Sequence, residues 1–280
     1  MFRRCLPILA LTISPLWPQW LRLPTPGIPR TPDSKPNLAA PAPRAADGKP
    51  DLSGLWEKTV DRYYNDITVD LDPAEVRPWA AALSRERKKS EKDNPIDACQ
   101  VLGPAYTITP YHESRILQTP GLVAILNDDL TFRQVYMDGR KLEQDPNPTW
   151  MGYSVGHWDG DTLVVESNGF NERTWLDLEG HPHTEELRMT ERYRRPDFGH
   201  IQLQVTFDDP KAYMKPFTVS ITMNLVTDTE MLEFVCDNEK DRAHMRNLLP
   251  ATDLVVPAAT LAAYAGVYDV KSAARPWWWK

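Results

Sequence analysis

From residue 113 onward, apolar and polar residues alternate with a period of two over several short segments. This period is typical of β-strands, because successive side chains of a strand point to opposite faces of the sheet. We therefore expect strands at 113–118, 121–127, 131–137, 151–158, 161–167, 186–194, 199–208, 216–225 and 230–236. Connections without intervening helices favour antiparallel pairing, so the pattern predicts an all-β, antiparallel, lipocalin-like barrel or a sandwich of about eight to ten strands.

Turn signals separate several of these segments. Asp159-Gly160 lies between two alternating runs, and this dipeptide is typical of a type I′ hairpin turn. Asp208-Asp209-Pro210 and Asp228-Thr229 interrupt the later runs. The signals favour strands joined mostly by tight turns.

One helix is predicted before the strands. Asp72 is a favourable N-cap, and Pro73 suits the first helical position. The helical pattern runs through Trp79 into the charged stretch 85–92, and Asn94-Pro95 ends it. We expect this helix to lie at the periphery of the β fold.

The segments 199–208 and 216–225 each alternate an apolar row with a polar row. The polar rows His200, Gln202, Gln204, Thr206 and Thr218, Ser220, Thr222, Asn224 carry no fixed charge. A water-facing sheet usually includes lysine and glutamate, so these uncharged rows could line a wet cavity. The alternative is an ordinary exposed face, since threonine suits strands in any case. The basic run 191–195 is typical of a solvated strand, although alternate arginines can also reach a carboxylate-bearing ligand.

Composition excludes some classes of partner. The formal net charge of −7 argues against nucleic acid, whose phosphates require a basic surface. No apolar stretch reaches 18 residues, so we expect no membrane span in the mature chain. Ten tryptophans would suit an all-β core or an aromatic-lined cavity.

The chain divides into four expected parts. Residues 1–23 pair a charged start with a short apolar run and resemble a secretory signal, the alternatives being a disordered tail or a misplaced start. Eight prolines in 24–50 predict an extended, unpacked linker. The β domain would occupy 51–248, and 249–280 would be a tail or a truncated C-terminal module. We expect a periplasmic or secreted protein.

The cysteines bear on this expectation. Cys5 would leave with the signal, so that Cys99 and Cys236 remain as a pair. In an oxidising compartment they could form a disulfide, and burial as two small apolar side chains is the alternative.

Gly54-Leu-Trp56, at the entry to the strands, resembles the Gly-x-Trp element of lipocalin-like barrels. That resemblance implies that Trp56 plugs one end of a barrel and that an arginine crosses it, with Arg188, Arg192 and Arg194 as candidates. The chain also resembles a family of exported bacterial proteins with no activity assigned. The similar stretches include Asp47-Gly-Lys-Pro-Asp-Leu-Ser-Gly-Leu-Trp56, Pro148-Thr-Trp-Met-Gly-Tyr-Ser-Val-Gly156, Gly160-Asp-Thr-Leu-Val-Val-Glu166 and Gly180-His-Pro-His-Thr-Glu185.

The long connection from Asn168 to Arg188 is the candidate for chemistry, since long loops on β scaffolds often carry function. If His181-Pro-His183-Thr-Glu185 is extended, its three titratable side chains project to one face. They could act as a general acid and base or bind a metal, and the plain alternative is loop packing. We predict a catalytic role for His181, His183 and Glu185 rather than a metal site.

Two functions follow as hypotheses. The first is a binding barrel for a small, partly apolar molecule, without a cofactor. Its expected ligand-binding residues are Trp150, Tyr153, Trp158, Asn171, Arg173, Trp175, Asp177 and Arg188. The second is a hydrolase, lyase or isomerase that uses the histidine segment. The sequence does not indicate an oligomeric state.

Overall fold

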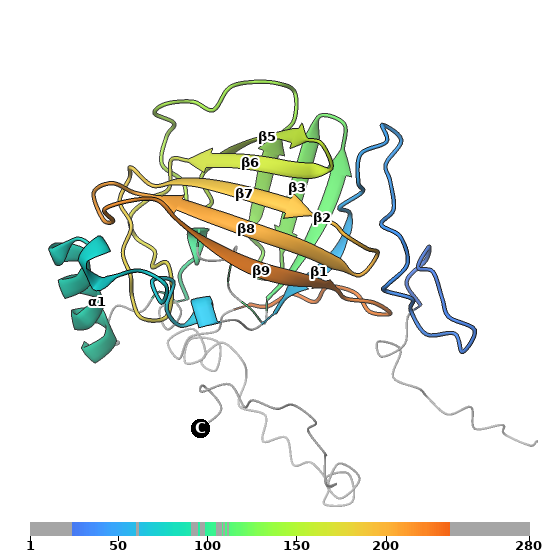
Figure 1. The fold of residues 1–280 in the computed structure, drawn as a ribbon, viewed down its shortest axis with the longest axis horizontal. Coiled ribbons are helices and arrows are strands. Elements are labelled where there is room, and N and C mark those ends of the chain that lie inside the picture. Colours follow the sequence, from blue (N-terminus) through green and yellow to red (C-terminus); the bar gives the residue numbers. More distant parts are fainter. Residues whose placement is uncertain are drawn as a thin grey trace, which may run out of the picture. The chain divides into compact units, whose positions relative to one another are not determined.

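The computed structural model describes residues 24–59, 62–90, 95, 99–104, 108, 110 and 112–235. Within these residues nine strands form one closed barrel, in the order in which they follow one another along the chain (Figure 1). They are β1 (Gly54–Lys58), β2 (Glu113–Thr119), β3 (Leu122–Asn127), β4 (Phe132–Tyr136), β5 (Tyr153–Asp159), β6 (Thr162–Asn168), β7 (Arg188–Arg194), β8 (His200–Asp208) and β9 (Phe217–Leu225). The expected all-β class is confirmed, and a barrel is the architecture adopted.

Strands β2 to β9 lie within two residues of the segments that alternation predicts. The expected strand at 230–236 is wrong over residues 230–235, which are loop, and Cys236 lies outside the described residues. The ninth strand is β1 instead, and it pairs with both β2 and β9. Because β9 already has β8 and β1 as neighbours, the closed barrel leaves no edge for a strand after it.

Neighbouring strands of the described barrel pair antiparallel everywhere except at β4 and β5. These two run parallel and share only the pairs Val135↔Ser154 and Tyr136↔Val155. Parallel neighbours need a crossover, and residues 137–152 provide it by returning the chain to the opposite end of the barrel. The expectation of antiparallel pairing is therefore wrong at this one junction.

The β5–β6 hairpin differs from the predicted turn. Asp159 pairs with Thr162, so the two loop residues are Gly160 and Asp161. Gly160 has a φ of +59°, whereas Asp161 is not among the residues with positive φ. A positive φ at the first central position alone is typical of type II′, so the predicted type I′ turn is wrong.

The helical segment has two parts. Asp72 caps the 3₁₀ helix η2 (Pro73–Glu75). Its carboxylate accepts from the Ala74 N–H, and the Asp72 backbone N–H donates to the Glu75 carboxylate. The α-helix α1 (Pro78–Ser90) begins only after Val76, which bridges to Tyr213. The residue before a proline is biased away from α geometry, which explains the interruption before Pro78. The predicted end of the helix at 94–95 lies at residues that are mostly outside the described part of the chain.

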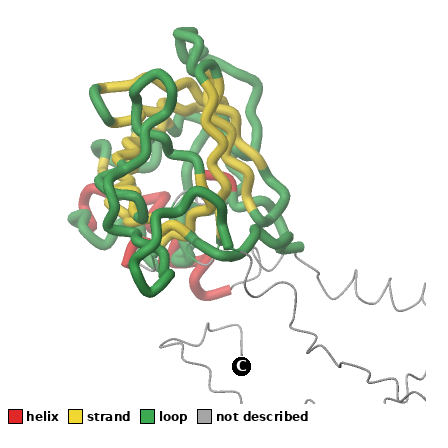
Figure 2. Tube along the Cα trace, turned by 90° about the vertical axis from the view of Figure 1, so that its right-hand side faces the viewer, coloured by secondary structure: helices red, strands yellow, loops and turns green. Residues whose placement is uncertain are grey.

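The barrel has two unlike ends, which strand direction defines. Short turns at 120–121, 160–161 and 195–199 meet at the hairpin end, and the connections 59–112, 169–187 and 209–216 meet at the loop end. Helix α1 belongs to the loop end, and the N-terminal segment runs along the opposite side (Figure 1). Figure 2 shows how much loop surrounds the yellow strands.

Residues 24–50 are extended but not unpacked, which corrects the linker expectation. The Phe198 N–H donates to the Ala40 carbonyl over 2.7 Å, and the Gly199 N–H donates to the Leu38 carbonyl over 2.8 Å. Arg44 forms a 2.7 Å ion pair with Asp161 at the β5–β6 turn. The segment thus follows the hairpin end of the barrel.

Other expectations about the ends of the chain lie outside the described residues, namely the signal at 1–23 and the tail at 249–280. Among the described helices, none has both the length and the apolar character needed to cross a membrane.

Candidate functional site

Trp56 closes the core at the hairpin end of the barrel. Its side chain is fully buried, and its Nε1–H donates to the Leu52 carbonyl over 2.9 Å. The Arg195 guanidinium lies over the indole, with Cζ 4.8 Å from the ring centroid. The arginine in contact with the tryptophan is therefore Arg195 and not one of the predicted candidates Arg188, Arg192 and Arg194.

The interior of the barrel is filled by side chains. Every strand except β5 contributes a buried apolar residue to the core, and Trp158 of β5 packs against it. Arg133 and Glu191 form a buried ion pair in this interior. Tyr193 donates to Glu191 Oε1 over 2.7 Å, and Arg133 Nη1 donates to the same oxygen over 3.0 Å. The cavity beside this network measures only about 20 Å³ and is also lined by Lys58. Among the described residues, this cavity leaves no space for a large molecule beside the charge pair.

Space for a ligand exists at the hairpin end. A pocket of about 420 Å³, which we call the mouth pocket, lies between the barrel wall and the N-terminal segment. Its lining residues are Ala45, Ala46, Asp47, Gln118, Thr119, Pro120, Val123, Met137, Gly139, Gly156, His157 and Trp158. Of the predicted ligand-binding residues, Trp158 lines the mouth pocket.

Two polar contacts shape the mouth pocket. Gln118 accepts from the Leu52 N–H over 2.9 Å and donates to the Pro50 carbonyl over 3.1 Å, which ties the N-terminal segment to β2. Gly156 allows the chain across the pocket to approach, because an added Cβ would lie 2.6 Å from the Met137 sulfur. Met137 thus fills the place that a side chain at residue 156 would take.

The other expected ligand-binding residues lie in separate places. Arg173 stacks on Trp150 with Cζ 5.2 Å from the ring centroid, and Asn171 accepts from the Arg173 N–H over 3.1 Å. Tyr153 lies on the outer wall, where its ring is 5.6 Å from that of Tyr136. Arg188 is exposed at the start of β7, and Trp175 and Asp177 are buried in the connection after β6.

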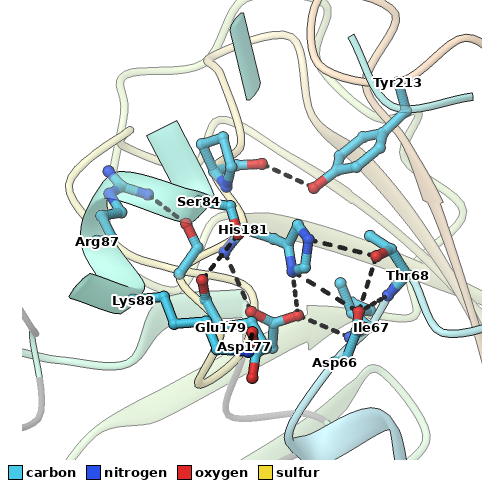
Figure 3. Close-up of polar contacts among 12 residues, drawn as sticks. Asp66, Ile67, Thr68, Ser84, Arg87, Lys88, Asp177, Glu179, His181 and Tyr213 are labelled. Carbon is cyan, nitrogen blue, oxygen red and sulfur yellow. Dashed lines mark hydrogen bonds and ion pairs between the residues drawn. The ribbon is translucent and has the colours of Figure 1, made fainter. Parts of the chain in front are cut away.

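Asp177 and His181 form the centre of a polar cluster at the loop end (Figure 3). The two side chains are 2.6 Å apart, from Nδ1 to Oδ2, and the same Oδ2 accepts from the Ile67 N–H over 2.7 Å. His181 Nε2 lies 3.3 Å from Thr68 Oγ1, which donates to Asp66 over 2.8 Å. No local pattern predicts this pairing, because residues 66–68 and 177–181 are far apart along the chain.

The two histidines have opposite electrostatic environments. Burial alone would lower the pKa of His181, but the hydrogen bond and charge of Asp177, with the charges of Asp66 and Glu179, outweigh it and raise the pKa. Burial lowers the pKa of His183 to about 4. We therefore assign a neutral ring to His183 at pH 7.

The segment 181–185 does not present its three side chains on one face. His183 is buried, with Nε2 2.8 Å from Thr174 Oγ1 and Nδ1 3.2 Å from the Thr184 carbonyl oxygen. Glu185 is exposed and accepts from Lys211 Nζ over 2.6 Å. Both rings are held by contacts within the loop-end connections, and the catalytic role of His181, His183 and Glu185 stays a prediction.

A metal ion could be held by Asp66, Asp177 and His181, whose possible ligand atoms lie within 4.8 Å of one another. One nitrogen with carboxylate oxygens would suit zinc or manganese. A hydrogen bond from His181 to the Asp177 carboxylate over 2.6 Å requires a proton on Nδ1, and the backbone N–H groups of His181 and Ile67 donate to the same carboxylate. An ion would have to displace this proton.

Fold and site together define, over the part of the chain that the structure describes, a closed nine-stranded β-barrel with one α-helix and a pocket at its hairpin end. Comparison of the chain with family models, with curated proteins and with solved structures finds no match. The resemblance to exported bacterial proteins therefore stays a prediction.

Proposed function

We propose that this protein binds a small, partly apolar molecule in the mouth pocket. The observation that carries the proposal is the volume of about 420 Å³ at the end of a closed barrel. Pockets for small molecules typically measure about 300–1,000 Å³ and often lie in barrel mouths. Because the axis is filled, the ligand would occupy the mouth and not the barrel centre.

The lining indicates the character of the ligand. Val123, Met137 and Trp158 offer apolar contact, and methionine and tryptophan adapt to flat or irregular apolar surfaces. His157 and Asp47 add polar groups that could orient one end of the molecule. We expect a ligand with an apolar body and a hydrogen-bonding end.

Export to the periplasm or beyond is part of this proposal. Cys99 is disulfide-bonded, which supports an oxidising compartment. Its partner lies outside the described residues, since Cys5 and Cys236 are the other cysteines of the chain.

Filling the pocket tests the proposal. Ala46→Trp places a large side chain at the mouth, and Ala39→Trp adds the same side chain to an exposed residue of the same segment, away from the pocket lining. With N-phenyl-1-naphthylamine as a fluorescent apolar probe, we expect saturable binding to the wild type and to Ala39→Trp but not to Ala46→Trp. Equal binding to all three proteins, or none to the wild type, would refute the mouth pocket as the site.

A further inference from the structure

The outer wall of the barrel carries a second concave surface, separate from the mouth pocket. This groove measures about 470 Å³ and crosses β6 to β9. Its lining residues are Thr162, Arg192, Arg194, Gln202, Leu203, Gln204, Ser220, Ile221 and Thr222. Leu203 and Ile221 are buried in the core, so the polar members supply the side chains that face a ligand.

The strand register arranges these polar side chains in two rows. Arg192 is opposite Gln204, and Gln204 is opposite Ser220. In the neighbouring row Arg194 is opposite Gln202, which is opposite Thr222. Each row begins with a guanidinium and continues over β8 and β9 with uncharged groups that donate and accept hydrogen bonds.

Charge distinguishes the groove from the rest of the surface. The chain has a formal net charge of −7, yet none of the residues that line the groove carries a carboxylate. Asp159 pairs with Arg192 at the rim over 2.7 Å, and Gln202 accepts from Arg194 over 3.1 Å. Because the Gln202 amide is neutral, this hydrogen bond does not neutralise the positive charge of Arg194. A guanidinium in this setting can form a bidentate pair with a carboxylate.

Spacing indicates the kind of molecule that carries this carboxylate. Neighbouring strands lie roughly 4.8 Å apart, which is close to the length of one sugar unit in a chain. A sugar chain laid across the strands would place successive hydroxyl groups over successive strands. The lining contains no aromatic ring, so recognition would use hydrogen bonds at the edges of the sugars.

We propose that this groove binds a short acidic oligosaccharide that contains uronic acid. Its carboxylate pairs with Arg194 at β7, and its hydroxyl groups contact Gln202, Gln204, Ser220 and Thr222 across β8 and β9. The same rows give a role to the uncharged outward side chains at 202–206 of β8 and 218–224 of β9. A plain solvated wall would need no such uniform set of amides and hydroxyls.

Isothermal titration with trigalacturonic acid tests the proposal, and its carboxyl-reduced, neutral form provides the ligand control. Arg194→Gln removes the Arg194 charge and leaves that of Arg192, and Gln204→Glu introduces repulsion for a carboxylate in the groove. Arg115→Gln, on β2, removes one arginine away from the groove. Circular dichroism establishes that each variant is folded.

We expect the acidic trisaccharide to bind the wild type and Arg115→Gln alike. Arg194→Gln should weaken binding roughly 10- to 100-fold, the range for loss of a charged hydrogen-bonded contact. Gln204→Glu should weaken it as well, and added salt should reduce the affinity of the wild type. Equal affinity for the neutral form, an equal loss in Arg115→Gln, or no binding at millimolar concentration would overturn the proposal.

Discussion

Replacing Glu191 by glutamine tests whether the barrel interior depends on its buried charge pair. The exposed fractions of the side chains are 6% for Arg133 and 0% for Glu191. Glutamine keeps the size and an acceptor for the Tyr193 hydroxyl but removes the charge that neutralises the guanidinium. Arginine does not lose its proton in proteins, so the variant would bury an unpaired charge.

Breaking a buried pair on one side typically costs about 3–5 kcal/mol. We therefore expect Glu191→Gln to lower the free energy of unfolding by about this amount, a large part of the 5–15 kcal/mol that stabilises a typical domain. Adding Arg133→Met removes both charges and should restore most of the loss, because apolar replacement of a whole buried pair is often neutral.

Urea unfolding followed by tryptophan fluorescence and circular dichroism gives the free energies. Asp159→Asn is the control, since it breaks the Arg192 pair on the surface, where the two side chains are 42% and 61% exposed. We expect little change there, because solvent screens the pair. If Glu191→Gln costs less than about 1 kcal/mol, or if the double variant is as unstable as the single one, the interior does not depend on charge pairing.

Four further predictions concern His181 and His183, the cysteines, and Trp56. In a histidine NMR titration, His183 should titrate near pH 4 and His181 above 6.5, and the reverse order would contradict the assigned environments. Because the pKa of His181 is raised on folding, its contribution to stability is complete below pH 6.5 and is lost as pH rises through the folded pKa. His181→Gln should therefore lower the free energy of unfolding more at pH 5.5 than at pH 9, as measured by urea unfolding at both pH values. Peptide mapping without reductant should find Cys99 linked to Cys236, with a loss of roughly 4–5 kcal/mol on reduction, and two free thiols would remove the pair. Trp56→Ala should cost about 3–5 kcal/mol in the same unfolding assay, because the indole is fully buried, and a cost near zero would show that Trp56 does not support the core.

Alternation predicted the strands well because the barrel wall separates a packed interior from solvent. In β8, for example, Ile201, Leu203 and Val205 are buried while Gln202 and Gln204 are exposed. The strand β1 escaped prediction because it has five residues and places Lys58 on the buried side. A charged residue at an inward position breaks the alternation of apolar and polar residues that predicts a strand.

Sequence reasoning found less of the candidate site, for a different reason. The mouth pocket joins Ala46, Val123 and Trp158, which come close only because the barrel closes and the N-terminal segment crosses its end. The pairing of Arg133 with Glu191 likewise depends on strands that are far apart along the chain. Local patterns carry no information about such contacts.

The parallel junction between β4 and β5 has a consequence for how the barrel is assembled. It divides the strands into two consecutive meanders, β1–β4 and β5–β9, each built from neighbours in sequence. Only two seams join the meanders, and one of them has just two residue pairs. β1 and β9 are the neighbouring strands that lie farthest apart along the chain, so loop-closure entropy predicts that their seam forms late in folding. A chain cut within 137–152 would leave the two meanders as separate pieces, paired only by three residue pairs between β1 and β9 and two between β4 and β5, and sharing the buried Arg133–Glu191 pair.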